Sequence, residues 1–507
     1  MSAPGPAAGK SLSERTLGGM LWMGGASAAQ MIMQIVCLAV LARLLTPADF
    51  GIAAASNVII AFSMLFSDLA LGPALIQRKE LDSRHIRTAF TASTLLGALL
   101  CLAIYLLSGP IAGFFRLPQV EQVTQLLGVV FVWQGLSTVS ENLLSRHLQF
   151  RRLATIKILS YILGYGLVSI VMAYRGWGYW SLAGGFIGQS LINMLLVMVL
   201  ARHDLRPMLH LRSLLDLARF GGGLSLGRIV NYVALSGDKL VIGRLIGGDA
   251  LGLYDRAYKL ASLPGGLYEM AASKVALSSL SRVQGEPQRL RAAYRRGIEL
   301  TALIGMPMTA LMVVLAPQII DVLLGPQWHH TVLPFVILSV STFSRLSYRV
   351  SNSVQFARGQ VYTFVLVQIA YAAIVIGGSW LAVPYGITGI AAVVTIAITL
   401  NSIVLAGVTL RLTGMGVGAF LMAHLPGCLM ALVFAGVAGA VVFAVGAALP
   451  PAAVLGLAAV AVAAAVAAVL AVPSRVLWGE DGLWLRTRCL AVFKGRATGS
   501  APLPAVK

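Results

Sequence analysis

The chain has 507 residues, of which 58% are hydrophobic and only 11% are charged. Soluble domains carry about 25% charged residues, so this composition excludes an ordinary soluble globule and indicates an integral membrane protein. The net charge of +20 is compatible with nucleic-acid binding. The basic residues lie between apolar runs and form no basic domain, so we instead favour the positive-inside bias of a multi-span protein and expect no nucleic-acid partner.

The N-terminus and the cysteines indicate no processing signal or metal. The apolar run after the polar first fifteen residues is too long for a signal-peptide core, so we interpret it as an uncleaved first span. Four cysteines form neither a CxxC pair nor a cluster with histidine, and they are Cys37, Cys101, Cys428 and Cys489. No disulfide framework, metal site or cofactor is therefore expected.

Apolar runs long enough to cross a bilayer, about 20 residues each, recur along the whole chain. The sequence predicts an all-α integral membrane protein with about fourteen transmembrane helices. We place them at 17–42, 49–72, 88–108, 120–145, 153–174, 178–200, 218–240, 249–275, 293–316, 331–356, 361–382, 385–410, 424–447 and 452–472.

The basic residues test this count. With a cytoplasmic N-terminus, they concentrate in every second loop and in the C-terminal tail: Arg78, Lys79, Arg84 and Arg87; Arg146, Arg151, Arg152 and Lys157; Arg202, Arg206, Arg212 and Arg219; Arg282, Arg289, Arg291, Arg295 and Arg296; Arg475, Arg486, Arg488, Lys494 and Arg496. The intervening loops are poor in Lys and Arg. This asymmetry predicts an even number of spans with both termini in the cytoplasm.

The spans divide the chain into six predicted regions. These are an N-terminal tail (1–16), an N-lobe (17–200), a cytoplasmic linker (201–217), a C-lobe (218–410), two further helices (424–472) and a basic cytoplasmic tail (473–507). The segments 201–217 and 277–292 are basic and amphipathic, so we expect short helices on the inner membrane surface there.

The two lobes carry an internal repeat. Leu41–Gly51 (LARLLTPADFG) and Ile242–Gly252 (IGRLIGGDALG) share an Arg, a Leu and a Gly at a constant offset of 201 residues. Each copy lies between the first and second helix of its lobe. Because six spans separate the copies, both lobes enter the membrane in the same direction. A parallel repeat of two six-helix lobes around a central cleft is therefore predicted.

Motifs for enzymatic chemistry are weak. Gly5–Ser11 (GPAAGKS) resembles a phosphate-binding loop, but it is one residue short between its glycines and no strand precedes it. GxSxG and HExxH motifs do not occur. The pairs His203–Asp204 and His329–His330 lie at membrane edges, where solvated loop residues are the simpler interpretation. We predict no catalytic residues.

The tenth predicted helix is the most polar, and its stretch Ser339–Gln355 contains two arginines four residues apart. Arg345 and Arg349 therefore share one helix face. Guanidinium groups bind phosphate oxygens in a bidentate geometry, so this face is a candidate pyrophosphate site. The alternative is a structural role, in which they pair with Glu299 or with backbone carbonyls.

Other polar residues inside the spans are candidate substrate-binding groups or interhelical contacts. Under the 201-residue offset, Asn231 of the seventh helix aligns with Gln30 of the first. The candidate substrate-binding residues in addition to the two arginines are Arg228, Asn231, Gln30, Gln34, Lys157, Gln189 and Asn193. The candidate ion-coupling acids are Asp68, Glu141, Asp238, Glu269 and Glu299. A local ion pair is the alternative for Asp238, with Lys239, and for Glu269, with Lys274, and most of these acids lie near a span end where they can reach water.

Five motifs together resemble a known family. They are L-A-R-L-L-T-P-A-D-F-G (Leu41–Gly51), S-D-L-A-L-G-P-A-L-I-Q-R-K (Ser67–Lys79), R-H-L-Q-F-R-R-L-A (Arg146–Ala154), G-W-G-Y-W-S-L-A-G-G (Gly176–Gly185), and D-K-L-V-I-G-R with L-G-L-Y-D-R-A-Y-K-L and L-P (Asp238–Pro264). The set is similar to the polysaccharide transporter, or Wzx-type, branch of the multidrug/oligosaccharidyl-lipid/polysaccharide flippase superfamily, over roughly residues 17–410.

The resemblance implies a flippase for undecaprenyl-pyrophosphate-linked oligosaccharides in the bacterial inner membrane, serving exopolysaccharide, O-antigen or capsule synthesis. It implies two six-helix lobes in a V shape and alternating access, with a polysaccharide polymerase and export machinery as candidate partners beside membrane lipids. Since no feature indicates ATP use, we expect coupling to an ion gradient, with protons as the expected ion. The alternatives are a drug or cation exporter of the same superfamily and a membrane-embedded glycosyl- or acyltransferase.

Overall fold

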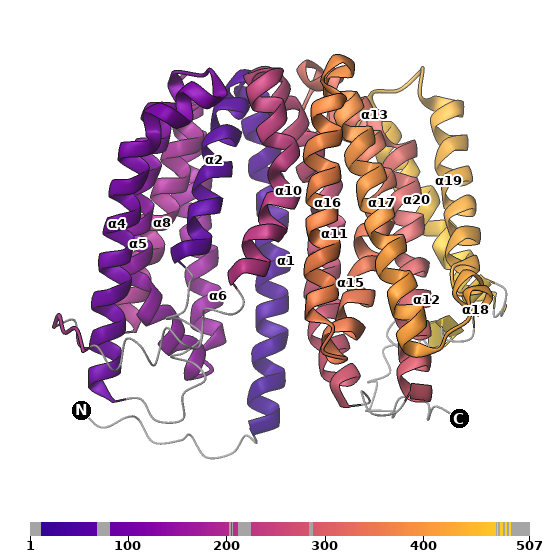
Figure 1. Cartoon of the computed structure of the whole chain (residues 1–507). Coiled ribbons are helices and arrows are strands. Elements are labelled where there is room, and N and C mark those ends of the chain that lie inside the picture. The colour runs from indigo at the N-terminus through magenta and orange to yellow at the C-terminus, as the bar shows by residue number, and fades with distance from the viewer. Residues whose placement is uncertain are drawn as a thin grey trace. The chain divides into compact units, whose positions relative to one another are not determined.

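The computed structural model describes residues 12–67, 82–201, 204, 206–210, 225–282, 287–472, 474, 477–479, 482–483 and 486–487. Helices are the regular secondary structure throughout these residues, and no β-strand occurs among them (Figure 1). The predicted all-α fold is thus confirmed. The chain forms two compact units, one of Met1–Tyr232 with Gly243–Gly252 and one of Val233–Ile242 with Leu253–Lys507.

The first unit contains the helices of the first predicted lobe. They are α1 (Leu12–Leu44), α2 (Pro47–Ser67), α4 (Ser83–Phe115), α5 (Gln119–Arg146), α6 (Phe150–Leu159), the π-helix η1 (Ser160–Leu167), α7 (Val168–Tyr174) and α8 (Trp180–Leu200). Local chemistry sets their ends. The side chain of Asp82 caps α4 by accepting from the Ser83 amide at 2.7 Å, and Arg116 ends α4 in the left-handed conformation.

Glycines bring α4 and α5 into close contact. A Cβ added at Gly97 would collide with the carbonyl oxygen of Phe131, and one added at Gly135 would collide with that of Ser93. The Ser93 hydroxyl also donates to the Gly135 carbonyl at 2.8 Å. Small residues and a hydroxyl hydrogen bond hold helices together where lipid provides no hydrophobic driving force.

Both ends of α10 (Ser225–Leu245) and the start of α11 (Gly248–Arg282) complete the first unit. The guanidinium of Arg244 donates to the carbonyls of Gly113 and Phe114 at 3.0 and 2.7 Å, and it lies 5.5 Å from the Phe114 ring centroid. These carbonyls belong to the last turn of α4, where backbone donors are scarce, although the Gly113 carbonyl also accepts from the Arg116 amide at 3.4 Å. Arg244 therefore caps a helix of the preceding repeat.

The second unit contains the remaining helices. They are the middle of α10, most of α11, α12 (Pro287–Val314), α13 (Ala316–Leu323), the 3₁₀ helix η3 (Pro326–Thr331), α14 (Val332–Val340), α15 (Thr342–Ala357), α16 (Val361–Leu381), η4 (Val383–Tyr385), α17 (Gly386–Thr413), α18 (Val417–Met422), α19 (Leu425–Val445) and α20 (Pro451–Ala471). The tenth predicted span is thus two helices, α14 and α15, which meet at Ser341.

Within the second unit, the two C-terminal helices pack against α12. A Cβ added at Gly427, in the first turn of α19, would collide with the carbonyl oxygen of Ala302 in α12. Further along, α19 and α20 share an apolar cluster with α12 that includes Leu311, Ala438 and Ala458. These helices lie outside the predicted repeat, and their contacts extend the core around α12.

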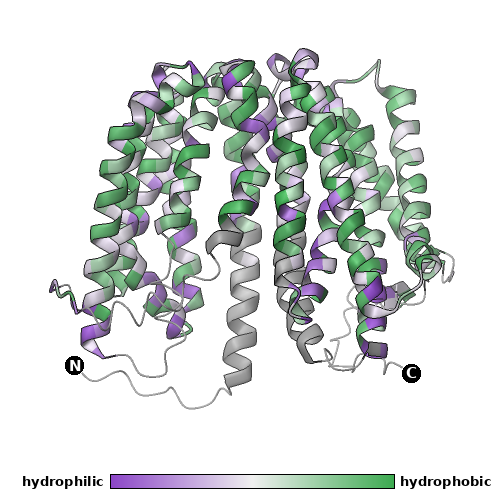
Figure 2. Ribbon diagram, viewed as in Figure 1, coloured by the Kyte–Doolittle hydropathy of each residue, from purple (hydrophilic) through white to green (hydrophobic). Residues whose placement is uncertain are grey.

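Eleven helices among the described residues are long and apolar enough to cross a membrane, and each overlaps a predicted span. Figure 2 shows hydrophobic residues along most of their lengths. The other three predicted spans, 17–42, 218–240 and 249–275, coincide with the helices α1, α10 and α11. The multi-pass architecture is therefore established, whereas the count of fourteen stays a prediction.

The linker between the predicted lobes has no helix at residues 206–210, contrary to our expectation for 201–217. Its backbone amides are satisfied by α4 instead. The amide of Met208 donates to the Thr91 hydroxyl at 2.9 Å, and that of His210 donates to the Thr88 hydroxyl at 3.3 Å. In the second segment, residues 277–282 continue α11 as one long helix.

Candidate functional site

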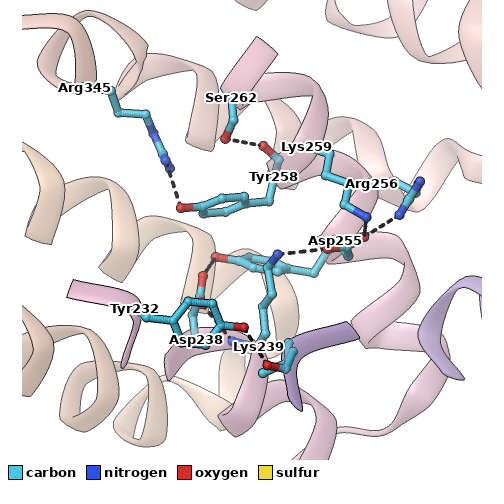
Figure 3. A network of polar contacts seen from close by, with 11 residues as sticks. Tyr232, Asp238, Lys239, Asp255, Arg256, Tyr258, Lys259, Ser262 and Arg345 are labelled. Atoms are coloured by element: carbon cyan, nitrogen blue, oxygen red, sulfur yellow. Dashed lines mark hydrogen bonds and ion pairs between the residues drawn. The ribbon is translucent and has the colours of Figure 1, made fainter. Parts of the chain in front are cut away.

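A buried carboxylate in α11, Asp255, is the centre of a charged cluster (Figure 3). One of its oxygens accepts from the ammonium of Lys239 in α10 at 2.9 Å. The other lies 2.9 Å from the ammonium of Lys259 and 2.5 Å from the guanidinium of Arg256. One carboxylate therefore forms ion pairs with three cations from two helices.

Helical spacing explains how α11 presents this cluster. Asp255 and Lys259 lie one turn apart, and so do Tyr254 and Tyr258, so each pair projects from the same part of the helix. α11 begins directly after Gly247, whose φ of 120° is a conformation that other residues rarely adopt. The tight turn returns the chain beside α10 and brings Lys239 to Asp255.

A second carboxylate, Asp238, is 1% exposed, so it depends on protein groups for its hydrogen bonds. It accepts from the Tyr254 hydroxyl at 2.6 Å and from the Lys239 amide at 2.8 Å. The alternative for Asp238 is an ion pair with the adjacent Lys239. The Lys239 ammonium instead contacts Asp255, while the Asp238 carboxylate accepts from the Tyr254 hydroxyl.

Arg345 of α15 joins the cluster through Tyr258. Its guanidinium donates to the Tyr258 hydroxyl at 2.9 Å and to the Ser341 hydroxyl at 3.2 Å, and it lies 4.6 Å from the Tyr258 ring centroid. The Lys239 ammonium lies 4.9 Å from the same centroid. The buried Nη2 of Arg345 has no hydrogen-bond acceptor among the described residues. A buried guanidinium nitrogen without an acceptor is costly, and an anion would satisfy it.

The second candidate arginine, Arg349, lies one turn along α15. A Cβ at Gly265 of α11 would be 3.7 Å from its Nη2. Both arginines are therefore placed against α11, Arg345 at Tyr258 and Arg349 at Gly265. The polar side chains Ser351 and Gln355 of α15 contact other helices, Tyr294 of α12 at 3.0 Å and Thr409 of α17 at 3.1 Å.

Two candidates from the first unit contact each other. The side-chain amide of Asn193 in α8 donates to the Glu141 carboxylate in α5 at 2.6 Å. Lys157 is exposed on α6. Gln189 is partly buried, and its backbone lies so close to Gly164 that a Cβ there would collide with it. On α1, Gln30 is partly buried and Gln34 is exposed.

Several candidates have no described surroundings. Asp68 lies outside the described residues, and the side chains of Arg228 and Glu269 are likewise not described, although both residues lie within helices. Asn231 is partly buried in α10. Their predicted roles stay predictions.

Glu299 has a partner that we had not considered. This α12 residue is 2% exposed, and its carboxylate accepts from the amide of Gly482 at 3.2 Å. Gly479, with φ of 69°, lies against the same oxygen. The indole of Trp478 donates to the carbonyls of Val469 and Val472 at 3.2 and 3.1 Å. Glu299 therefore binds the segment that follows α20.

The sequence analysis missed the cluster residues on α11 and Lys239 of α10 as site residues. Asp255, Arg256, Lys259 and Tyr258 were used only as part of a family motif. The signal that could have identified them is an acid and two bases, two of them at i and i+4, inside an otherwise apolar helix.

The cluster has an excess of positive charge. Lys239, Arg256, Lys259 and Arg345 are the cations, and Asp238 and Asp255 are the two carboxylates. Such an arrangement suits an anion better than a cation. In the part of the chain that the structure describes, no three His, Cys, Asp or Glu side chains gather as metal ligands would.

Comparisons with known proteins identify relatives. The family described as polysaccharide biosynthesis protein matches residues 40–333. The lipopolysaccharide biosynthesis protein WzxC of Escherichia coli K12 is 26% identical over 336 residues, which cover 65% of this chain and 67% of that protein. The teichuronic acid biosynthesis protein TuaB of Bacillus subtilis 168 is 24% identical over 355 residues, with 69% and 73% covered. The solved structure of the lipid II flippase MurJ, in an inward closed conformation, has a TM-score of 0.72 at 13% identity and covers 94% of this chain and 100% of that chain. This last similarity shows a shared fold.

Proposed function

Because the chain belongs to the polysaccharide biosynthesis protein family of flippases, we propose that it transports undecaprenyl-pyrophosphate-linked oligosaccharide repeat units across the bacterial inner membrane. WzxC and TuaB, which are named as biosynthesis proteins of lipopolysaccharide and of teichuronic acid, support a role in polysaccharide synthesis, and the lipid II flippase MurJ shares the fold. The transported unit would serve synthesis of an exopolysaccharide, an O-antigen or a capsule.

The observation that carries the proposal is the excess of positive charge around Tyr258. A diphosphate head has several negative oxygens, and Arg345 offers a buried guanidinium nitrogen that has no acceptor among the described residues. The fork of a guanidinium matches two phosphate oxygens. In our proposal Arg345 and Arg349 bind the diphosphate, and Lys259 is the exposed cation of the same cluster.

The physical task explains why such a site is needed. The sugar and diphosphate are strongly hydrated, so their unaided passage through hydrocarbon is very costly. The undecaprenyl tail is apolar and can stay in lipid. A polar site that opens to one membrane side at a time lowers the barrier for the head without opening a continuous pore.

Coupling to an ion gradient, with protons as the expected ion, is the second part of the proposal. Glu141 and Asp238 are partly buried and buried carboxylates, and they accept from Asn193 and Tyr254 respectively. Burial disfavours the charged form of a carboxylate, which makes these two acids candidates for carrying a proton. In this scheme both termini are cytoplasmic, and a polymerase with its export machinery receives the product.

A drug or cation exporter of the same superfamily is disfavoured by the charge of the cluster. With four cations and two carboxylates, the cluster has a net positive charge and would repel a cationic ligand. The relatives named above are also transport or biosynthesis proteins of polysaccharides and lipid precursors, which does not favour an enzymatic function for this chain.

The test uses purified protein in proteoliposomes loaded with a labelled undecaprenyl-pyrophosphate oligosaccharide and an imposed pH gradient. We expect the wild-type protein to expose the labelled sugar to an external glycosidase, and Arg345→Ala with Arg349→Ala to abolish this. Arg411→Ala, which removes an exposed arginine of α17, is the matched control. Normal transport by the folded double variant would remove the site. Transport of ethidium in place of the oligosaccharide would support the exporter.

A further inference from the structure

The three cations around Asp255 differ in how far they reach out of the protein. The side chains of Lys239 and Arg256 are 14% and 9% exposed, whereas that of Lys259 is 47% exposed. The carboxylate that holds all three is only 3% exposed. Lys259 is therefore the member of the cluster that an incoming ligand can reach first.

The acceptors of the cations also differ. Lys239, Arg256 and Lys259 contact the charged oxygens of Asp255, whereas the Arg345 guanidinium donates to the neutral hydroxyls of Tyr258 and Ser341. The ring of Tyr258 lies within 4.9 Å of the Lys239 ammonium and 4.6 Å of the Arg345 guanidinium. Tyr258 therefore lies beside both Lys239, which is paired with the Asp255 carboxylate, and Arg345, which donates to neutral hydroxyls.

We propose that Asp255 is an internal substitute for the anionic head of the substrate. In the absence of ligand its carboxylate neutralises Lys259. An arriving diphosphate takes the Lys259 ammonium from Asp255 and bridges it to the Arg345 guanidinium, while Lys239 and Arg256 keep Asp255 neutralised. This inference rests on the proposed function for the identity of the anion, and it adds Asp255 as a positioning residue that acts through Lys259.

When a phosphate replaces the Asp255 carboxylate as the partner of Lys259, the exchange lowers the affinity for the substrate. A lysine that already has a carboxylate partner loses that pairing when the phosphate binds, so binding is weaker than it would be to a free cation. The same competition speeds release, because Asp255 recaptures Lys259 as the diphosphate leaves. A transporter benefits from this balance because a head that binds too tightly is not released.

The experiment measures binding of sugar-free undecaprenyl pyrophosphate to the full chain in nanodiscs. We expect Asp255→Asn to lower the Kd about tenfold, since Lys259 loses its competing carboxylate, and Lys259→Gln to raise it about tenfold. The double variant should bind like Lys259→Gln, because the gain depends on that lysine. Asp255→Glu should restore wild-type affinity. Asp249→Asn, an exposed acid in the first turn of the same helix, is the matched control and should leave the Kd unchanged.

Transport kinetics distinguish a positioning role of Asp255 from an effect of its substitution on folding. Folded Asp255→Asn should lower both KM and kcat for the labelled lipid-linked oligosaccharide, whereas a loss of structure would lower kcat alone. An unchanged or higher Kd in folded Asp255→Asn, or a gain that persists in the double variant, would overturn the proposal. If Asp255→Asn does not fold, the test depends on Lys259→Gln. An unchanged Kd for undecaprenyl pyrophosphate in that variant would also overturn the proposal.

Two further measurements complete the test. One identifies the ligand as a lipid head, and the other distinguishes failure of this inference from failure of the proposed function. Inorganic pyrophosphate at equal concentration should not displace the lipid, and equal displacement would overturn the assignment to a lipid head. If the wild type binds undecaprenyl pyrophosphate with the expected response of the variants but moves no oligosaccharide, the proposed function fails while the role of Asp255 stands.

Discussion

Gly51 and Gly252, which are equivalent under the predicted 201-residue offset, lie against each other. A Cβ added at Gly252 would be 2.9 Å from the Gly51 nitrogen and would collide with the carbonyl oxygen of Pro47. A Cβ added at Gly51 would collide with the carbonyl oxygen of Gly248. Pro47 and Gly248 are themselves equivalent at the 201-residue offset, so the contact has the reciprocal form of a two-fold interface. The two short motifs that match at this offset therefore lie where the starts of α2 and α11 are in contact.

Substitution of either glycine should therefore destabilise the protein to a similar extent. Gly51→Ala and Gly252→Ala each insert a methyl group against backbone that cannot move aside, which costs about 1–3 kcal/mol. The measurement is the thermal midpoint of purified protein in detergent. Gly377→Ala is the control, because a Cβ there meets nothing within 4 Å. If the two variants are as stable as the control, the close contact is not real.

Tyr258 should contribute to transport through both its hydroxyl and its ring. Tyr258→Phe removes the acceptor for Arg345, and Tyr258→Leu also removes the ring beside Lys239 and Arg345. A hydrogen bond to a charged group contributes about 1.5–3 kcal/mol and a cation–π contact about 0.5–2 kcal/mol. We expect kcat/KM for lipid-linked oligosaccharide to fall about tenfold in Tyr258→Phe and further in Tyr258→Leu. Equal values for the two variants would show that the ring is unimportant.

Glu141→Gln should separate ion coupling from structure. A glutamine carbonyl can still accept from Asn193, so we expect the protein to fold normally. If Glu141 carries a proton, transport by this variant no longer responds to an imposed pH gradient, although exchange without a gradient continues. Flux is compared in proteoliposomes with and without the gradient. A gradient response equal to that of the wild type would assign Glu141 to interhelical contact alone.

Glu299 should hold the segment after α20 in place. Glu299→Ala removes the acceptor of the Gly482 amide, and the loss of a buried charged hydrogen bond costs about 1–3 kcal/mol. We expect faster cleavage of the C-terminal tail by trypsin, followed by mass spectrometry of the released peptides. Asp249→Ala, which removes an exposed acid of α11 and no trypsin site, is the control. Unchanged cleavage of Glu299→Ala would mean that other contacts, such as those of Trp478, suffice.

The family and the membrane class could be derived from the sequence. The motif resemblance is confirmed by the family match over residues 40–333, and eleven of the predicted spans coincide with apolar helices. The candidate site was derived only in part. Arg345 was identified because a charged residue in an apolar helix is conspicuous, but its contact with Tyr258, 87 residues away, was not predicted.

The sequence by itself determined the all-helical membrane class and the apolar helices, because hydropathy is summed over neighbouring residues, and the repeat of its two halves stays a prediction. Only the tertiary structure decided that Asp255 holds three cations, that Glu299 binds the segment after α20, and that Gly51 lies against Gly252. The physical reason is that a buried polar group must find its partner among the helix faces that packing brings together. Those faces are remote along the chain, and no local pattern records which of them will meet.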